Sequence, residues 1–136
     1  MENFQLDHDI HVFYVEADSF PMGIGAAQEK IHALAPLTGE RKFFGISFPG
    51  RDGKIIYKAA AEEATPGELQ QLGLPEFILR KGNYITQTLH DYPKNFAQFE
   101  SIFAELLKHP DLDPQGCCVE WYLDDHDCRC MVRLQS

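Results

Sequence analysis

A single glutamate lies inside an apolar and aromatic segment near the end of the chain. Residues 118–134 read CVEWYLDDHDCRCMVRL, which predicts two β-strands joined by a short acidic turn, with Glu120 in the first strand. A carboxylate among apolar side chains loses hydration and is best stabilised when a cation replaces the lost water. Aromatic faces add cation–π attraction of roughly 0.5–2 kcal/mol for each well-placed ring. Glu120 therefore points to the binding of flat, hydrophobic cations.

A second interpretation of Glu120 is a surface ion pair across the same hairpin. If residues 124–127 form the turn, the apolar side chains of both strands share one surface, which would pack on helices. Glu120 would then lie on the opposite, solvated surface, where Arg129 and Arg133 are diagonal neighbours that could simply pair with it. The hairpin alone leaves both interpretations open. This register predicts the cross-strand pairs Leu123–Cys128, Trp121–Cys130 and Val119–Val132.

All four cysteines lie between residues 117 and 130, which raises the question of a metal site. Adjacent strand residues point to opposite faces, so Cys117 and Cys118 cannot both join one tetrahedral cluster without distorting the strand. Even with His126 the spacing matches no zinc pattern, and we interpret the cysteines as reduced, small strand hydrophobes. The segment PGRDGK at 49–54 lacks phosphate-loop spacing and indicates a hairpin turn. The sequence therefore predicts no metal and no cofactor.

The charge balance limits the expected partners. The 136 residues contain 12 Lys and Arg against 21 Asp and Glu, a formal net charge of −9. Such a chain repels nucleic acid and anionic membrane surfaces, so we expect neutral or positive partners. The sequence shows neither a basic-then-apolar leader nor a run of about eighteen apolar residues, which favours a cytoplasmic protein without a membrane span.

The same order of elements is predicted twice along the chain. Apolar residues at 3–4 spacing indicate two helices, and β-branched and aromatic runs bounded by turn residues indicate the strands. The repeated unit is strand, helix, strand, strand. In chain order the predicted elements are strand 10–17, helix 21–34, hairpin 41–60, a polar connector 62–75 with one short helix, strand 76–89, a helix opened by Tyr92-Pro93, and hairpin 118–134.

The two halves can be superimposed as repeats, one of about 8–61 and one of about 76–135. A shift of 72 residues aligns the helices, and a shift of 74 aligns the hairpins and places Ile46 on Glu120. Two βαββ units predict one α+β domain with pseudo-twofold symmetry, an antiparallel or mixed sheet and both helices on one face. We expect a ligand cleft where the halves meet, charged on one side only. The surface of the first repeat that matches Glu120 is predicted to carry Phe44, Ile46, Phe48, Ile55 and Tyr57.

Three features in this order are similar to a known family. GNY at 82–84, the Tyr92-Pro93 helix start and VEWYL at 119–123 resemble the GyrI-like small-molecule-binding family, which includes effector-binding domains of AraC-type and MerR-type multidrug-responsive transcription regulators. The resemblance implies a GyrI-like or SOUL-like fold in which Glu120 receives cationic, lipophilic ligands. It also suggests a cleft lined by Phe20, Phe48, Tyr57, Tyr92, Phe96 and Tyr122, with Ile46 at the uncharged side.

The resemblance favours a stand-alone binding module for small lipophilic cations, because 136 residues leave no room for the helix-turn-helix of the regulators. The alternative is a cofactor-independent hydrolase of strained electrophiles, with Glu120 as general base and Tyr122 or Tyr57 orienting the substrate. A haem-binding or protein-inhibitor role is a further alternative. A homodimer or a separate protein partner stays open, and no direct contact with nucleic acid or membrane is expected.

Overall fold

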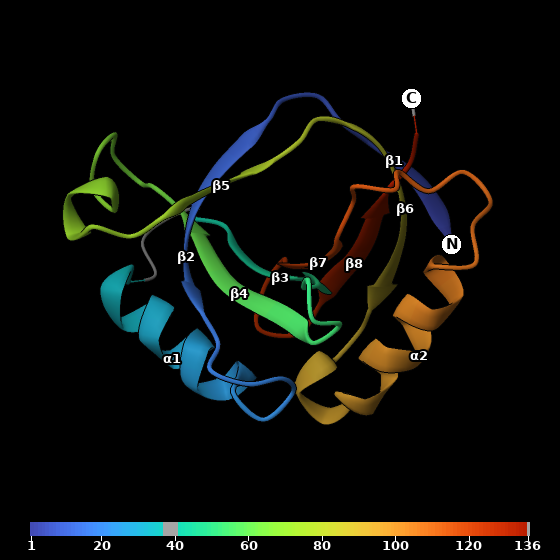
Figure 1. Ribbon diagram of the computed structural model, residues 1–136, viewed down its shortest axis with the longest axis horizontal. Coiled ribbons are helices and arrows are strands. Elements are labelled where there is room, and N and C mark those ends of the chain that lie inside the picture. Colours follow the sequence, from blue (N-terminus) through green and yellow to red (C-terminus); the bar gives the residue numbers. More distant parts are fainter. Residues whose placement is uncertain (37–40, 136) are drawn as a thin grey trace. The chain divides into compact units, whose positions relative to one another are not determined.

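The computed structural model describes residues 1–36 and 41–135 and shows an α+β protein with antiparallel strands (Figure 1). The chain divides into two compact units. The first-repeat unit comprises Asp9–Leu79, and the second-repeat unit comprises Met1–His8 together with Arg80–Ser136.

The first-repeat unit is a four-stranded antiparallel sheet with one long helix. Its strands lie in the order β3-β4-β2-β5, and the helix α1 contacts β4 and β2. The elements are β2 (Ile10–Glu16), α1 (Ile24–Leu34), β3 (Phe43–Pro49), β4 (Ile55–Glu62), the short 3-10 helix η1 (Gln70–Leu72) and β5 (Glu76–Leu79).

The second-repeat unit has the same arrangement. Its strands lie in the order β7-β8-β6-β1, and the helix α2 contacts β6 and β8. The predicted duplicated βαββ frame is therefore confirmed, whereas the pseudo-twofold relation and the common face for both helices stay predictions. The elements are β1 (Glu2–Leu6), β6 (Gly82–Leu89), the 3-10 helix η2 (Tyr92–Lys94), α2 (Ala97–Leu106), β7 (Cys118–Tyr122) and β8 (Cys128–Arg133).

The predicted strand 76–89 is wrong as one element. It is two strands, β5 and β6, which pair with different partners in different units. Gly82 follows the break with a φ of +137°, a conformation that L side chains rarely adopt, and a Cβ there would lie 2.8 Å from Nη2 of Arg133. The strand β1 was not predicted, because its sequence ENFQL lacks a run of β-branched residues.

The core of the second-repeat unit lies between α2 and one face of its sheet. Ile102 and Leu106 of the helix contact Ile85, Leu89 and Val132 of the strands. Phe99 and Phe103 pack against this core, whereas Phe96, just before the helix, is 63% exposed. An aromatic side chain at the start of the helix therefore lies close to solvent.

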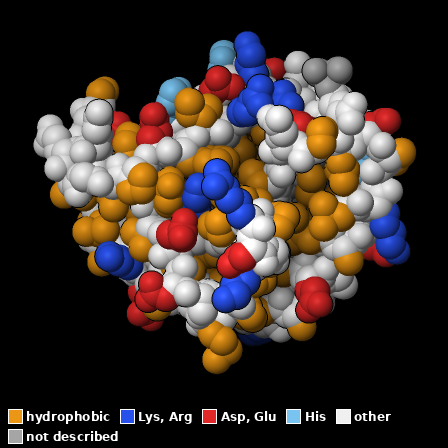
Figure 2. All heavy atoms as spheres, in the orientation of Figure 1, with side chains coloured by type: hydrophobic (Ala, Val, Ile, Leu, Met, Phe, Trp, Pro, Cys, Tyr) orange, Lys and Arg blue, Asp and Glu red, His pale blue; other side chains and the backbone are white. Residues whose placement is uncertain are grey.

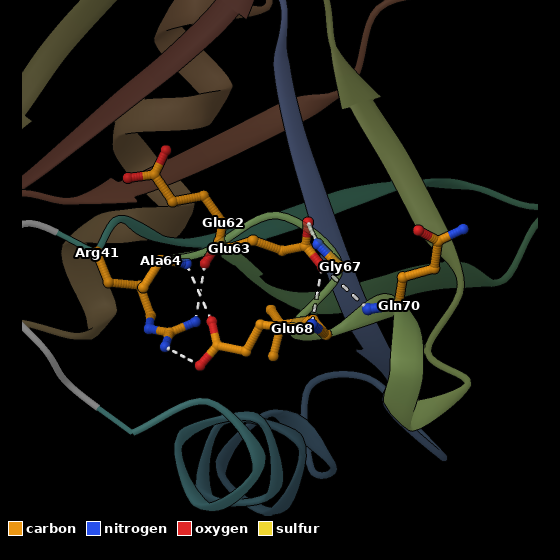
Figure 3. Close-up of polar contacts among 8 residues, drawn as sticks. Arg41, Glu62, Glu63, Ala64, Gly67, Glu68 and Gln70 are labelled. Carbon is orange, nitrogen blue, oxygen red and sulfur yellow. Dashed lines mark hydrogen bonds and ion pairs between the residues drawn. The ribbon is translucent and has the colours of Figure 1, made fainter.

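The connector 62–75 contains the predicted short helix, η1, and polar contacts fix its position (Figure 3). Arg41, only 7% exposed, donates through Nη2 to Glu68 at 2.8 Å and through Nη1 to the carbonyl of Glu62 at 3.0 Å. Glu63 accepts backbone N–H groups of the following turn, including that of Leu69 at 2.8 Å. The hydrogen bond from Arg41 is the chief reason that the pKa of Glu68 lies below its ordinary value.

Candidate functional site

The β7–β8 hairpin places Glu120 on the helix side of its sheet. Glu120 pairs with Cys130, and Tyr122 pairs with Cys128. The carboxylate of Asp124 accepts the backbone N–H groups of His126 and Asp127, both at 2.7 Å, which makes the turn one residue shorter than predicted. The predicted register is therefore wrong by one residue, and such a slip moves side chains to the other face of a sheet.

The interpretation that Glu120 forms a surface ion pair with an arginine of this hairpin is also wrong. Arg129 and Arg133 lie on the face of the sheet that points away from α2. The guanidinium carbon of Arg129 lies 4.4 Å from the ring centroid of Phe4 and 5.1 Å from that of Trp121. Arg133 instead contacts Asp113, with Nη1 2.8 Å from Oδ2. Both arginines are thus engaged on the opposite side of the sheet from Glu120.

The carboxylate of Glu120 is held by a neighbour on its own strand. The hydroxyl of Tyr122, two residues further along and on the same face, donates to Oε1 of Glu120 at 2.6 Å. This distance is typical of an O–H group bound to an ionised carboxylate. Burial, together with the smaller effect of the charge of Glu120, raises the pKa of the nearby Cys118 to about 11. The carboxylate therefore lies in a half-buried region where its charge is felt by its neighbours.

Aromatic rings continue from this pair towards solvent. The ring centroids of Tyr92 and Tyr122 are 5.3 Å apart, and Tyr92 also approaches Phe96 at 6.1 Å and Phe99 at 6.3 Å. The backbone N–H of Tyr92 donates to the carbonyl of His126 at 2.8 Å, which ties the start of η2 to the hairpin turn. We call Glu120, Tyr122, Tyr92, Phe96 and Phe99 the acidic aromatic surface.

Four of these five residues were predicted from the sequence as ligand-binding residues, and their role in binding stays a prediction. Phe99 was not predicted as a site residue; it is half-buried, packs against the core, and its ring lies 6.2 Å from that of Phe96. Its position one turn after Phe96 was the available signal, because residues three apart share a helix face.

Figure 2 shows that apolar side chains reach the surface between charged groups on the viewed face.

The site residues predicted in the first repeat do not share one face. Tyr57 pairs with Ser47, whereas Ile46 pairs with Lys58, so Tyr57 lies on the opposite face from Ile46 and Phe48. The Tyr57 hydroxyl accepts a hydrogen bond from Nε2 of Gln28 in α1 at 2.9 Å, which identifies its face as the helix side. Among the predicted site residues, Phe20 lies next to Tyr57, and the centroids of their rings are 6.2 Å apart. Ile55 lies on the same face as Tyr57.

The alignment of the repeats also changes at the hairpin. Gly50 donates to the carbonyl of Lys54 next to one turn, and Leu123 donates to that of Asp127 next to the other. These equivalent positions differ by 73 residues, since 50 + 73 = 123, and the same shift places Ser47 on Glu120. The predicted match of Ile46 with Glu120 is therefore wrong, although the counterpart is still uncharged.

Within residues 1–36 and 41–135, no three His, Cys, Asp or Glu side chains are grouped so that they could hold a metal ion. Cys128 and Cys130 are buried, and burial is the main cause that raises the pKa of Cys128, so its thiol stays protonated. None of the helices in the described residues is long and apolar enough to cross a membrane.

Comparison with solved structures finds the same fold in other proteins. An integron cassette protein, VCH_CASS2, from the mobile metagenome of Vibrio cholerae has a TM-score of 0.70 at 17% identity, over 98% of this chain and 95% of that one. SAV2435 bound to tetraphenylphosphonium has a TM-score of 0.70 at 13% identity, over 99% and 93%. The chain shares their fold.

A third structure with this fold is a candidate bacterial transcription regulation protein from Staphylococcus aureus MU50. Its TM-score is 0.58 at 12% identity, over 97% of each chain. Neither the protein-family models nor the curated proteins give a match by sequence. At these identities the likeness is one of fold, and it is consistent with the resemblance to the GyrI-like family.

Proposed function

We propose that this chain is a binding module for small lipophilic organic cations, and that the cation binds at the acidic aromatic surface. The observation that carries the proposal is the 2.6 Å hydrogen bond that holds Glu120 beside Tyr122, with the ring of Tyr92 packed at a tilt against the same tyrosine. The carboxylate supplies attraction for positive charge, and each well-placed ring adds roughly 0.5–2 kcal/mol.

The lipophilic character follows from the outer edge of this surface. Phe96 is 63% exposed, and a ligand that covers apolar area gains about 25 cal/mol for each Å² removed from water. A lining of apolar and aromatic side chains with one charged group is typical of ligand sites. The fold offers independent support, because SAV2435, which shares it, is bound to tetraphenylphosphonium, an ion of this chemical class.

The surface is also organised before any ligand arrives. The hydroxyl of Tyr122 orients Glu120, and the backbone of Tyr92 is fixed to the hairpin turn through His126. Side chains that are already ordered lose less conformational entropy on binding. Affinity for a cation should therefore depend on these two contacts as well as on the charge.

The test is titration of tetraphenylphosphonium and tetraphenylborate, two ions of similar shape and opposite charge, into the wild type and Glu120→Gln. The variant keeps the side-chain shape, so the fold should be retained. Loss of a charge-assisted contact should weaken tetraphenylphosphonium about ten- to a hundredfold and reduce the preference for the cation over the anion. Glu105→Gln is the matched control, because it removes the same charge from an exposed position of α2.

Two outcomes contradict the proposal. Equal affinity for tetraphenylphosphonium in the wild type and folded Glu120→Gln would show that the carboxylate does not receive the cation. An equal loss in Glu105→Gln would show that net charge, and not the acidic aromatic surface, attracts the ligand.

The hydrolase alternative rests on the same pair of residues. A carboxylate bound to a phenol at 2.6 Å offers a general base next to a group that could orient a substrate, without a metal. If the chain is such an enzyme, Glu120→Gln should abolish turnover of a strained electrophile while Tyr122→Phe retains part of it. Saturable binding of tetraphenylphosphonium with no turnover of any strained electrophile would favour the binding module.

A further inference from the structure

A lysine of the first-repeat unit is enclosed by aromatic rings. Nζ of Lys58 lies 4.3 Å from the ring centroid of Tyr14, 5.0 Å from that of Phe48 and 5.1 Å from that of Phe77. All these distances are within the range of about 6 Å for cation–π attraction. The three rings come from three strands, β2, β3 and β5, and Lys58 from a fourth, β4. We call Tyr14, Phe48 and Phe77 the aromatic cage.

The register explains why these rings converge. Lys58 pairs with Ile46 in β3 and with Glu16 in β2, so its side chain lies on the sheet face opposite Tyr57 and α1. Residues two apart on a strand share a face, which brings Phe48 and Tyr14 to the same side. The cage is therefore formed by the sheet alone.

The ammonium group prefers these rings to a nearby carboxylate. Glu16 is the direct cross-strand partner of Lys58, at a spacing where opposite charges can pair. Yet in the described part of the chain, Lys58 forms neither an ion pair nor a hydrogen bond through Nζ, and its contacts are the three rings. The cage thus binds an alkylammonium group at the expense of an available ion pair.

We propose that the aromatic cage is a binding site for small alkylammonium compounds, and that Lys58 occupies it as a tethered competitor until a ligand displaces it. The four-carbon side chain of lysine is flexible, so the displaced ammonium can turn to Glu16 across the strand pair. Three rings around one cation form the kind of site that recognises quaternary ammonium groups. The site is independent of the proposed function, because Glu120 belongs to the other compact unit.

The competition gives a quantitative expectation. If the cage holds Lys58 with the cation–π energy of about 0.5–2 kcal/mol, removing Lys58 should strengthen ligand binding by about 2- to 30-fold. The probes are choline and its uncharged isostere 3,3-dimethylbutan-1-ol, followed by chemical-shift changes in β2 and β4. Lys58→Ala vacates the cage, and Lys58→Thr, which suits a strand, is a second variant in case the first does not fold.

Three controls make the test specific. Lys54→Ala removes the same charge from the exposed turn of the same hairpin and should leave choline affinity as in the wild type. Tyr14→Leu in the Lys58 variant should remove the gain, because the closest ring is lost. Glu120→Gln in that variant should not change choline binding at the cage, which separates this site from the acidic aromatic surface.

Several results would overturn the proposal. Choline affinity that is unchanged in both folded Lys58 variants would show that Lys58 does not compete for the cage. Equal affinity for choline and 3,3-dimethylbutan-1-ol would show that the site responds to apolar bulk and not to charge. A gain of the same size in Lys54→Ala would reduce the effect to net charge.

Discussion

The hydrogen bond between Tyr122 and Glu120 predicts a measurable energetic coupling between the two side chains. Tyr122→Phe removes the hydroxyl that lies 2.6 Å from Oε1 and keeps the ring that contacts Tyr92. Glu120→Ala removes the carboxylate. A double-mutant cycle built from these two variants isolates the pair from everything else that either residue contacts.

The expected size of the coupling follows from the geometry. Hydrogen bonds to charged groups contribute about 1.5–3 kcal/mol, and the 2.6 Å distance lies in the strong range for O–H donors to carboxylates. Both side chains are only half-buried, so water competes for the same groups. We therefore expect a coupling in the free energy of unfolding of about 1–2 kcal/mol.

The assay is urea unfolding of the wild type, both single variants and the double variant at 25 °C. The control cycle combines Glu120→Ala with Tyr92→Phe. The second variant keeps its ring in place, and the effects of the two variants on the free energy of unfolding should add. Additivity of the Glu120 and Tyr122 variants within about 0.5 kcal/mol would refute the reasoning, because the close contact would then carry no net energy. A coupling of similar size in the control cycle would show that the effect is not specific to the hydrogen bond.

Two further predictions concern stability. Leu106→Ala, at a fully buried helix position, should lower the free energy of unfolding by about 2–5 kcal/mol, whereas Leu107→Ala, at the half-exposed neighbour, should change it by about 0.5 kcal/mol or less in the same urea experiment. The hydrogen bond from Arg41 lowers the folded-state pKa of Glu68 below its ordinary value, so its contribution to stability is complete above that ordinary value and is lost as pH falls through the folded-state pKa. Glu68→Gln should therefore lower stability at pH 7 and flatten the acid side of the stability–pH curve. The control variant Glu29→Gln on α1 should leave the curve unchanged. If Glu68→Gln loses stability at low pH as steeply as the wild type, the prediction is contradicted.

Periodicity predicted both helices and the repeated order of elements, but not the strand β1. The 3–4 spacing predicted both helices, and the doubled strand, helix, strand, strand order predicted the two equivalent units. The break between β5 and β6 was not predictable from apolar pattern, because both strands continue the same run of strand-forming residues. What separates them is pairing with different partners, which depends on residues far away in the sequence.

The limit of prediction from sequence is clearest in the register of the β7–β8 hairpin. The acidic turn sequence is compatible with more than one loop length, and the choice depends on the hydrogen bonds from His126 and Asp127 to the carboxylate of Asp124. A change of one residue moves Glu120 from the solvated face to the helix face. The sequence therefore predicted Glu120 and its aromatic neighbours as site residues, but the sheet face on which Glu120 lies could be assigned only from the backbone pairing.

The duplicated frame distributes charge differently over its sheet faces, and this affects where an external cation binds. On the face away from the helix, each unit already places its own cation over aromatic rings, Lys58 in one and Arg129 in the other. On the helix face, Glu120 in the second-repeat unit contrasts with the uncharged Ser47 at the matching position. An external cation must displace an internal one at the aromatic cage, whereas at Glu120 it meets a negative charge. We therefore expect a lipophilic cation to occupy the acidic aromatic surface at lower concentration than the cage.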